Sequence, residues 1–406
     1  MNVLELGEKL FANPELGYKE VKTKAILKEY LEERGFKLEN ECLNTAFSVS
    51  IGSGHPHIGL IAELDAILTL GHPMASKTDN AAHACGHSTQ CAIMAEAITK
   101  LKDLNLPGKV TLFFTPAEEF TDMAYRKQLI KEGKIKYIGG KTNMLALGLF
   151  DDCDLFIHLH ASSDQNKHFA LNTALAGFVY KQYTFVGKAS HAAVLPHLGR
   201  NALSACSLFL NALGLMRESF CDEDHVRIHG IIADGGQTVN SIAEKASYEC
   251  YIRCLNANTL KTLAARVDEA AVHCAKALGC DCKIETVPGY LPLKQNQTIC
   301  KVIREVMLEY CKQEEIDDGS YSMAAGDVGD ISVFKPIVQF GYTGFGGVIH
   351  GKDLCILDPE RIYLETSAIV CKVVAKIAND PELIAAIIKE HQPLMSKEEY
   401  LQYLEG

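Results

Sequence analysis

Hydrophobic positions in the first part of the chain form two kinds of segment. Continuous apolar runs at 58–62, 110–114 and 155–159 predict strands that are buried on both faces. Between them, the segments 19–35 and 88–104 carry apolar residues at helical spacing. Strands that alternate with helices of this length indicate a mainly parallel sheet with helices on both faces.

The pattern changes near Phe178. The next segments predict, in order, a strand, a helix, two strands, a helix and a strand, at 179–186, 200–216, 226–232, 246–254, 259–278 and 283–287. This order is typical of a small antiparallel sheet with two helices.

After Pro288 and Gly289, helical patterns return at 300–311 and 362–377, with a buried strand at 336–340. We therefore predict an α/β fold whose larger domain is interrupted by a smaller α+β insert. The expected boundaries are 1–177 and 290–406 for the larger domain and 178–289 for the insert.

Composition narrows the class of protein. The 406 residues are 48% hydrophobic and 22% charged, the balance of a soluble globular protein. A net charge of −11 argues against a nucleic-acid partner, and no apolar run is long enough to span a membrane. The first residues do not have the pattern of a signal peptide, so we expect a cytoplasmic protein with 15 reduced cysteines.

One cysteine and two histidines stand close together in the segment His83-Ala84-Cys85-Gly86-His87. Cys85 and His87 can reach one ion from this loop, and a thiolate with an imidazole suits zinc or a similar divalent metal. The alternative is a buried cysteine beside ordinary loop histidines. Three candidate ligands so close together favour the metal.

Glu118 and Glu119 follow the strand predicted at 110–114. Open α/β sheets bind ligands at such strand ends, where adjacent carboxylates are costly unless a cation compensates them. One carboxylate can bind metal while the other takes a proton from the water that the metal activates. The alternative is a solvated acidic turn, and it is the partnership with Cys85 and His87 that favours the functional interpretation.

Four more residues are candidates for the same site. His158 and His160 share one face of the strand predicted at 155–159, so either could face the metal. His350 follows a glycine-rich segment after the last predicted strand. Each histidine, taken singly, is more often structural than a ligand. Asp65 could orient a ligating imidazole or cap a helix.

The insert contains two polar motifs, 187–193 with His197 after it, and 234–240, which ends in Asn240. They fit turns that use glycine and asparagine for left-handed backbone geometry. They also fit donors that bind substrate and a tetrahedral oxyanion, and spacing alone leaves both open. The chain has no Gly-x-Ser-x-Gly nucleophile elbow, no phosphate loop and no His-Glu-x-x-His.

Together these segments resemble the aminoacylase/carboxypeptidase family of dinuclear metallo-amidohydrolases. Within it, the chain is similar to the hippurate, indole-acetyl-amino-acid and aminobenzoyl-glutamate hydrolases. The resemblance runs along nearly the whole chain, through 13–16, 62–65, 83–87, 116–119, 187–197, 235–240 and His350.

The resemblance implies a catalytic domain with an inserted lid that also mediates dimerisation. Two divalent ions, zinc or else manganese, cobalt or iron, would be bound by Cys85, His87, Glu119, His350 and one of His158 and His160. Glu118 would be the general base, with Asp65 supporting the catalytic site, and His191 would help to stabilise the oxyanion. The substrate carboxylate would be held by Asn240 and Arg253, with His197 and Asp327 as further substrate-binding candidates.

Three departures from the family pattern stand out. Ser88 replaces the acid that usually follows the Cys-Gly-His triplet, and His350 is not followed by proline. The segment 326–330 replaces the common Glu-Asp-Phe with Gly-Asp-Val-Gly-Asp, as in the aminobenzoyl-glutamate hydrolase branch. In that branch a histidine leads into a small-residue loop, which favours His160 over His158.

We therefore predict a metal-dependent hydrolase of the amide bond in an N-acyl or aminoacyl amino acid or a related small amide. A dipeptidase or aminopeptidase is the alternative within the same chemistry. A non-catalytic homologue that binds a small ligand is the alternative from another class. The intact Glu118-Glu119 pair counts against it, because a binding protein needs no base. The expected partners are a small-molecule substrate and a second copy of the chain.

Overall fold

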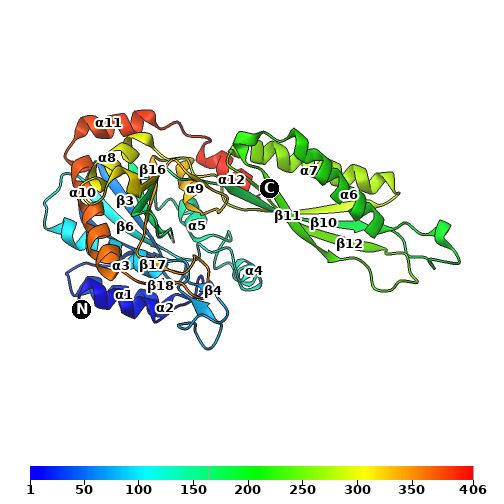
Figure 1. Ribbon diagram of the computed structural model, residues 1–406, viewed down its shortest axis with the longest axis horizontal. Coiled ribbons are helices and arrows are strands. Elements are labelled where there is room, and N and C mark those ends of the chain that lie inside the picture. Colours follow the sequence, from blue (N-terminus) through cyan, green and yellow to red (C-terminus); the bar gives the residue numbers. More distant parts are fainter. Residues whose placement is uncertain (163, 406) are drawn as a thin grey trace. The chain divides into compact units, whose positions relative to one another are not determined.

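The computed structural model describes residues 1–162 and 164–405, which form two compact units (Figure 1). Unit 1 comprises Met1–Ala174, Lys294–Tyr321 and Gly326–Ser396. Unit 2 comprises Leu175–Leu293, Ser322–Ala325 and the residues from Lys397 onwards. We expected 290–406 to belong to the larger domain, whereas 322–325 and the C-terminal helix pack with unit 2.

Unit 1 is built on one eight-stranded sheet. In spatial order its strands are β1 (Glu39–Cys42), β2 (Ala46–Gly52), β6 (Lys109–Thr115), β3 (His57–Glu63), β7 (Leu155–Ala161), β16 (Ile337–Tyr342), β8 (Phe169–Leu171) and β14 (Ile316–Asp318). The central strands β6, β3, β7 and β16 are parallel, so their carboxyl ends lie at one edge. The predicted mainly parallel sheet is confirmed.

Helices cover this sheet because its central strands are apolar on both faces; β3 is buried along its whole length. The main helices are α1 (Val3–Phe11), α2 (Val21–Glu32), α3 (His87–Lys102), α8 (Gln297–Met307), α10 (Thr366–Ala378) and α11 (Pro381–Glu390). Shorter elements are α4 (Met123–Lys131), α5 (Gly140–Ala146), α9 (Val328–Ser332), the π-helical turn Glu360–Glu365, β4 (Ile67–Leu68), β5 (Ala81–Ala82), β17 (Phe345–Gly346) and β18 (Cys355–Ile356).

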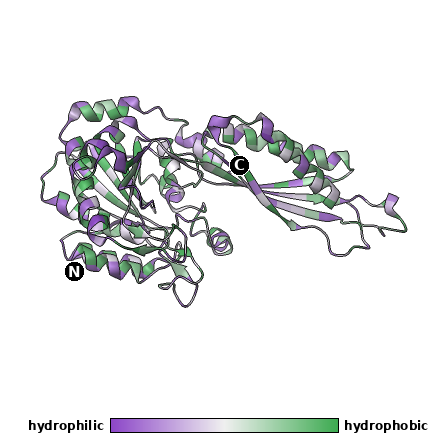
Figure 2. Cartoon of the chain, viewed as in Figure 1, coloured by the Kyte–Doolittle hydropathy of each residue, from purple (hydrophilic) through white to green (hydrophobic). Residues whose placement is uncertain are grey.

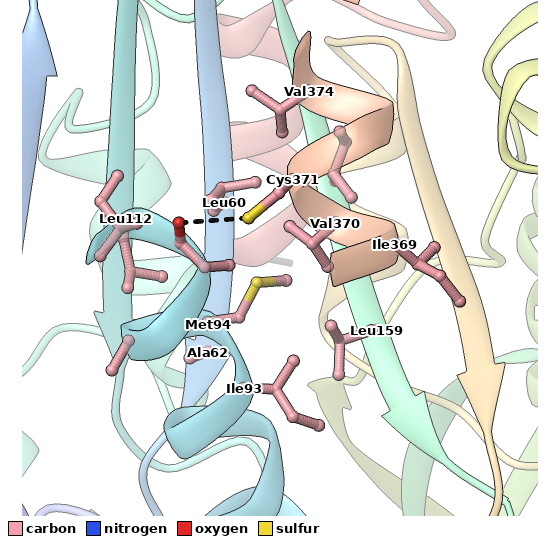
Figure 3. Close-up of a cluster of buried hydrophobic side chains, with 14 of the residues drawn as sticks. Leu60, Ala62, Ile93, Met94, Leu112, Leu159, Ile369, Val370, Cys371 and Val374 are labelled. Carbon is pink, nitrogen blue, oxygen red and sulfur yellow. Dashed lines mark hydrogen bonds between the residues drawn. The ribbon is translucent and has the colours of Figure 1, made fainter. Parts of the chain in front are cut away.

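The core of unit 1 lies where α3 packs against both the sheet and α10. Leu60 and Leu112 of the sheet meet Met94 of α3 and Val370 of α10 (Figure 3). The Cys371 thiol donates a hydrogen bond of 3.5 Å to the carbonyl of Ala97 in the same cluster. Because α3 is enclosed by neighbours, its first turn is held firmly at the carboxyl edge of the strands.

Unit 2 contains the six elements that the sequence predicted, in the same order. Its antiparallel sheet has the order β11 (Arg227–Asp234), β12 (Lys245–Cys254), β10 (Gly177–Val186) and β13 (Asp281–Pro288). Two helices, α6 (Ala202–Met216) and α7 (Ala257–Ala277), pack on it, and both carry hydrophilic and hydrophobic residues along their length (Figure 2). The last helix, α12 (Lys397–Glu405), contacts β13.

None of the helices in the described ranges combines the length and the apolar character that a membrane span requires.

Candidate metal centre

Most of the metal-ligating side chains predicted from the sequence gather at the carboxyl edge of the central strands. Cys85 and His87 flank Gly86 at the start of α3, and Glu119 follows β6. His160 lies near the end of β7, and His350 lies in the loop after β17. Segments far apart in the sequence therefore meet here because parallel strands end at the same edge.

The distances among these side chains are those of a compact cluster. Cys85 Sγ lies 3.4 Å from His160 Nε2 and 3.3 Å from His350 Nε2. His350 Nε2 is 3.1 Å from Glu119 Oε1. Four groups have candidate ligand atoms within 4.8 Å of one another, and three of them contain predicted ligands: Cys85 with His87 and His160, Cys85 with Glu119 and His350, and His87 with Glu118 and Glu119. Shared members join the three groups into one cluster.

Local backbone geometry explains how the loop residues reach the cluster. Gly86 has a φ of +89°, and a Cβ there would lie 2.4 Å from Cβ of Ala161, so glycine is required. His350 also has a left-handed φ of +65°, and its amide donates to the carbonyl of Ala84 at 2.7 Å. This hydrogen bond fastens the His350 loop to the Cys85 loop.

His158 and His160 have different surroundings although they share a strand face. The His160 ring approaches Cys85, and its Nδ1 lies 2.9 Å from the carbonyl of Ala161. The His158 ring is fully buried, with Nδ1 2.9 Å from Gln339 Oε1 and Nε2 3.0 Å from Gln90 Nε2. Of the two, only His160 belongs to one of the candidate ligand groups.

Several unsatisfied atoms in the cluster suit a bound cation. His87 Nδ1 lies 2.9 Å from the Asp65 carbonyl. His87 Nε2 and Glu119 Oε1 are buried and make no hydrogen bond of good geometry among the described residues, although they lie 3.2 Å from Glu63 Oε2 and 3.1 Å from His350 Nε2. Burial disfavours a charged imidazole, but Cys85 and Glu63 outweigh it and raise the pKa of His87. The surroundings thus favour positive charge here, and sulfur, nitrogen and oxygen donors together fit divalent metal ions.

Sequence comparison assigns the chain to a family. The model of "Peptidase family M20/M25/M40" matches residues 59–379, which is well over half of the chain. The chain belongs to this peptidase family. Membership of the M20 family makes it a metal-dependent hydrolase of amide bonds, and it confirms the resemblance and the enzyme class predicted from the sequence.

Relatives and solved structures agree with this assignment. Xaa-Arg dipeptidase of Mus musculus is 26% identical over 360 residues, which cover 85% of this chain and 75% of the relative. Hippurate hydrolase of Campylobacter jejuni is 25% identical over 291 residues, 69% of this chain and 71% of the relative. The solved structure of a dinuclear metal-binding M20 peptidase from Bacillus subtilis superposes on this chain with a TM-score of 0.72. The two sequences are 18% identical, and the match covers 92% of this chain and 97% of the Bacillus chain. The last likeness shows the shared fold.

In this M20 chain, Asp65 contacts both loops that carry candidate ligands. Its Oδ1 lies 3.4 Å from His87 Nδ1, and its Oδ2 accepts a hydrogen bond of 3.0 Å from the amide of Glu119. Asp65 is fully buried, and of its two oxygens only Oδ2 accepts a hydrogen bond among the described residues. Ser88, the residue after His87, is also buried, and its hydroxyl has no hydrogen-bond partner among the described residues.

A buried lysine that the sequence analysis missed lies beside Glu118. Carboxylate oxygens of Glu63, Glu118 and Asp327 lie within 4.8 Å of one another. Lys141 Nζ donates to Glu63 Oε1 at 2.5 Å and to Asp327, and the Lys141 amide donates to Asp327 Oδ2 at 3.1 Å. Burial raises the pKa of Glu118, and the charges of Glu63 and Glu119 raise it further. Lys141 carries no sequence motif that would have pointed to this role.

The candidates for substrate binding, together with the oxyanion candidate His191, are divided between the units. Asp327 belongs to unit 1, where it is fully buried and paired with Lys141. The remaining candidates lie in unit 2: His191, His197, Asn240 and Arg253. His191 is exposed, and its Nδ1 accepts from the amides of two residues that follow it, at 3.3 and 3.2 Å.

Arg253 is the most firmly held of the unit 2 candidates. Its guanidinium lies 5.2 Å from the ring centre of Phe178 and 5.4 Å from that of Tyr251. It also donates to the carbonyl of Met323 at 3.0 Å. Asn240 and His197 are exposed on loops of the same unit. A planar cation held against two aromatic rings can offer its remaining donors in a set direction.

Proposed function

We propose that this M20 protein hydrolyses the amide bond of N-acyl or aminoacyl amino acids with two divalent ions and Glu118 as general base. The proposed ligands are Cys85, His87, Glu119, His160 and His350. The observation that carries the proposal is the approach of two histidine Nε2 atoms, from separate segments, to within 3.4 Å of Cys85 Sγ. A thiolate among the ligands makes zinc the first metal to test, before manganese, cobalt or iron.

Bound ions of this kind lower the pKa of water toward neutrality and polarise the scissile carbonyl. The protein's own contribution is proton transfer and orientation. Glu118 takes the proton of the attacking water and returns it to the leaving nitrogen. Asp65 keeps His87 and the Glu119 loop in place through the contacts described above.

Residues of unit 2 are proposed to bind the substrate. Arg253, with its guanidinium held against two aromatic rings, would bind the substrate carboxylate through paired hydrogen bonds, with Asn240 beside it. His191 would donate to the developing oxyanion, and His197 would contact the substrate. Asp327 is withdrawn from this set because its carboxylate is buried against Lys141.

A homodimer and a cytoplasmic location also belong to this proposal. β11 is the edge strand of the unit 2 sheet, and Ile231 and Ile232 on it are 64% and 46% exposed. An exposed apolar edge strand is a natural surface for a second copy to cover. The cysteines are all free thiols, which fits a reducing compartment.

The decisive experiment compares Glu118→Gln with the unaltered enzyme. We expect about two divalent ions per chain in both proteins, measured by elemental analysis after purification without chelator. Turnover of a panel of N-acyl amino acids should be nearly abolished in the variant alone. Near-normal turnover by Glu118→Gln would refute the base assignment, and absence of metal even after incubation with zinc would refute the metal site.

A dipeptidase is the second candidate, favoured by the likeness to Xaa-Arg dipeptidase over 85% of this chain. The two are separated by pairs of substrates that share a C-terminal residue and differ only in whether the amino terminus is blocked. A preference for the free amine supports the dipeptidase, and a preference for the acylated form supports the amidohydrolase.

A further inference from the structure

The loop that carries Glu118 and Glu119 turns at a strained residue. Ala117 is fully buried and has a φ of +54°, in the left-handed region that an alanine rarely adopts. Its conformation sets the direction in which the chain leaves Pro116 and therefore where the two carboxylates point. A strained residue persists only where its surroundings hold it.

Two buried ionisable side chains, Glu20 and Arg126, bind the backbone of Ala117 at its amide and at its carbonyl. The Ala117 amide donates to Glu20 Oε1 at 3.0 Å, and the Ala117 carbonyl accepts from Arg126 Nη1 at 3.3 Å. Arg126 Nη2 also donates to the carbonyl of Glu119. The far oxygen of Glu20 accepts from the hydroxyl of Thr45 at 2.6 Å. Glu20 thus binds the turn before the two carboxylates, and Arg126 binds it on both sides of Glu118.

Two glycines allow neighbouring segments to pack closely against this loop. A Cβ at Gly17 would lie 2.6 Å from Arg126 Nη2 and 2.8 Å from Cα of Ala117. A Cβ at Gly140 would lie 1.7 Å from the carbonyl oxygen of Pro116. Backbone therefore approaches the loop from two sides at distances that only glycine permits.

Burying a charge is costly unless its hydrogen bonds are satisfied. Glu20 and Arg126 are both 0% exposed, and neither has an ion-pair partner within residues 1–162 and 164–405. Glu20 instead accepts from the Ala117 amide and the Thr45 hydroxyl. The two terminal nitrogens of Arg126 donate to the carbonyls of Ala117, Ile138 and Glu119, while its Nε has no hydrogen-bond partner among the described residues. We therefore infer that these two buried ionisable groups serve to hold the backbone of the turn in a fixed position.

We propose that Glu20 and Arg126 are positioning residues that fix Glu118 and Glu119 in the orientation the reaction needs. The inference rests on the proposed function and extends it to two residues whose side chains contact the backbone of the Ala117–Glu119 turn and not the ligand side chains. Without the hydrogen bonds of either side chain, the strained turn can relax, and Glu118 and Glu119 then move together.

The test uses Arg126→Met and Glu20→Met, with Arg126→Lys and Glu20→Gln as conservative partners. Glu20→Gln keeps an acceptor for the Ala117 amide, so it should behave like the unaltered enzyme. Lys181→Met is the matched control, because Lys181 is another buried cation, paired with Asp268 at 2.7 Å in unit 2. Zinc affinity is measured by competition with a chromophoric chelator, and kcat and KM are measured on the best N-acyl substrate.

We expect both methionine variants to lose zinc affinity and kcat by roughly 10–100-fold, the range for residues that orient metal ligands, with little change in KM. Lys181→Met should lower thermal stability and leave zinc affinity unchanged. Folded methionine variants with unaltered zinc affinity and kcat would overturn the proposal. If Arg126→Met fails to fold, the comparison of Glu20→Met with Glu20→Gln decides by the same criteria.

These outcomes are separate from a failure of the proposed function. If the unaltered enzyme binds zinc and Glu118→Gln abolishes turnover, but both methionine variants are unaffected, only the positioning role fails. If the unaltered enzyme binds no zinc, the proposed function itself fails.

Discussion

Replacing Lys141 with methionine tests whether its ammonium compensates the buried carboxylates around Glu118. Methionine has a similar length but no charge, so packing changes little while the ion pairs with Glu63 and Asp327 are lost. In the unaltered protein all three side chains are at most 2% exposed, so water cannot replace the missing cation. The variant therefore leaves two buried carboxylates that have lost their main counter-charge.

Removing one partner of a buried pair costs about 3–5 kcal/mol. For domains of 150–250 residues, each kcal/mol lowers Tm by roughly 2–4 °C, so we expect a fall of at least about 6 °C. The fall should depend on pH. Burial opposes ionisation of Glu63, but Lys141 and His158 outweigh it and hold the pKa of Glu63 well below its ordinary value.

The direction in which stability changes with pH follows from the pKa values of the carboxylates in the folded and unfolded protein. In the unaltered protein, the stabilisation from ionised Glu63 is present above the unfolded pKa and is lost as pH falls through the folded pKa. Without Lys141, burial raises the folded pKa of both carboxylates, so the variant loses stability as pH rises. The difference between the two proteins should therefore grow from pH 5 to pH 8.

Differential scanning calorimetry with a chelator present, at several pH values, measures this difference without a contribution from bound metal. The triple variant Lys141→Met/Glu63→Gln/Asp327→Asn is the control, because it removes the charges together and should recover part of the loss. A Tm within 2 °C of the unaltered protein at pH 8, or a difference that does not change with pH, would refute the charge-compensation argument.

Three further predictions follow from the geometry of the site. His160→Ala should weaken zinc binding by about 10-fold or more, whereas His158→Ala should destabilise the fold and keep the metal; equal metal loss in both, by elemental analysis, contradicts this. Gly140→Ala should disturb the Pro116 loop and lower both Tm and metal content, while Gly214→Ala, which has nothing within 4 Å of the added carbon, should raise Tm slightly. Burial raises the pKa of Glu20 to about 8, so stability should decline as pH rises from the unfolded pKa toward 8, and a Glu20→Gln protein that shows the same decline in calorimetry would count against that pKa.

Sequence patterns predicted the elements whose burial is uniform. β3 is buried on both faces and its sequence contains a continuous apolar run. β10 is buried mainly on one face, so buried and partly exposed residues alternate along it. The antiparallel edge β1–β2 was missed because β1 is short and mostly exposed. The α5 helix was missed because its glycine-rich start carries no helical period.

The candidate site was predictable where chemistry lies in short motifs at strand ends. Cys85 with His87 and the Glu118-Glu119 pair are such motifs. The supporting groups were not, because Glu20, Arg126 and Lys141 are charged residues that a sequence assigns to the surface. Only the tertiary fold encloses them, so their significance depends on contacts between distant segments.

The split of unit 1 along the chain has a consequence for the protein's biosynthesis. β7 pairs with β16, and facing residues such as His158 and Gln339 are 181 positions apart. A ribosome therefore completes the main segment of unit 2, Leu175–Leu293, before it synthesises β16, the strand that pairs with β7. Until then β7 exposes an unpaired apolar edge, and chains stalled in this interval are the ones that a chaperone must protect from aggregation.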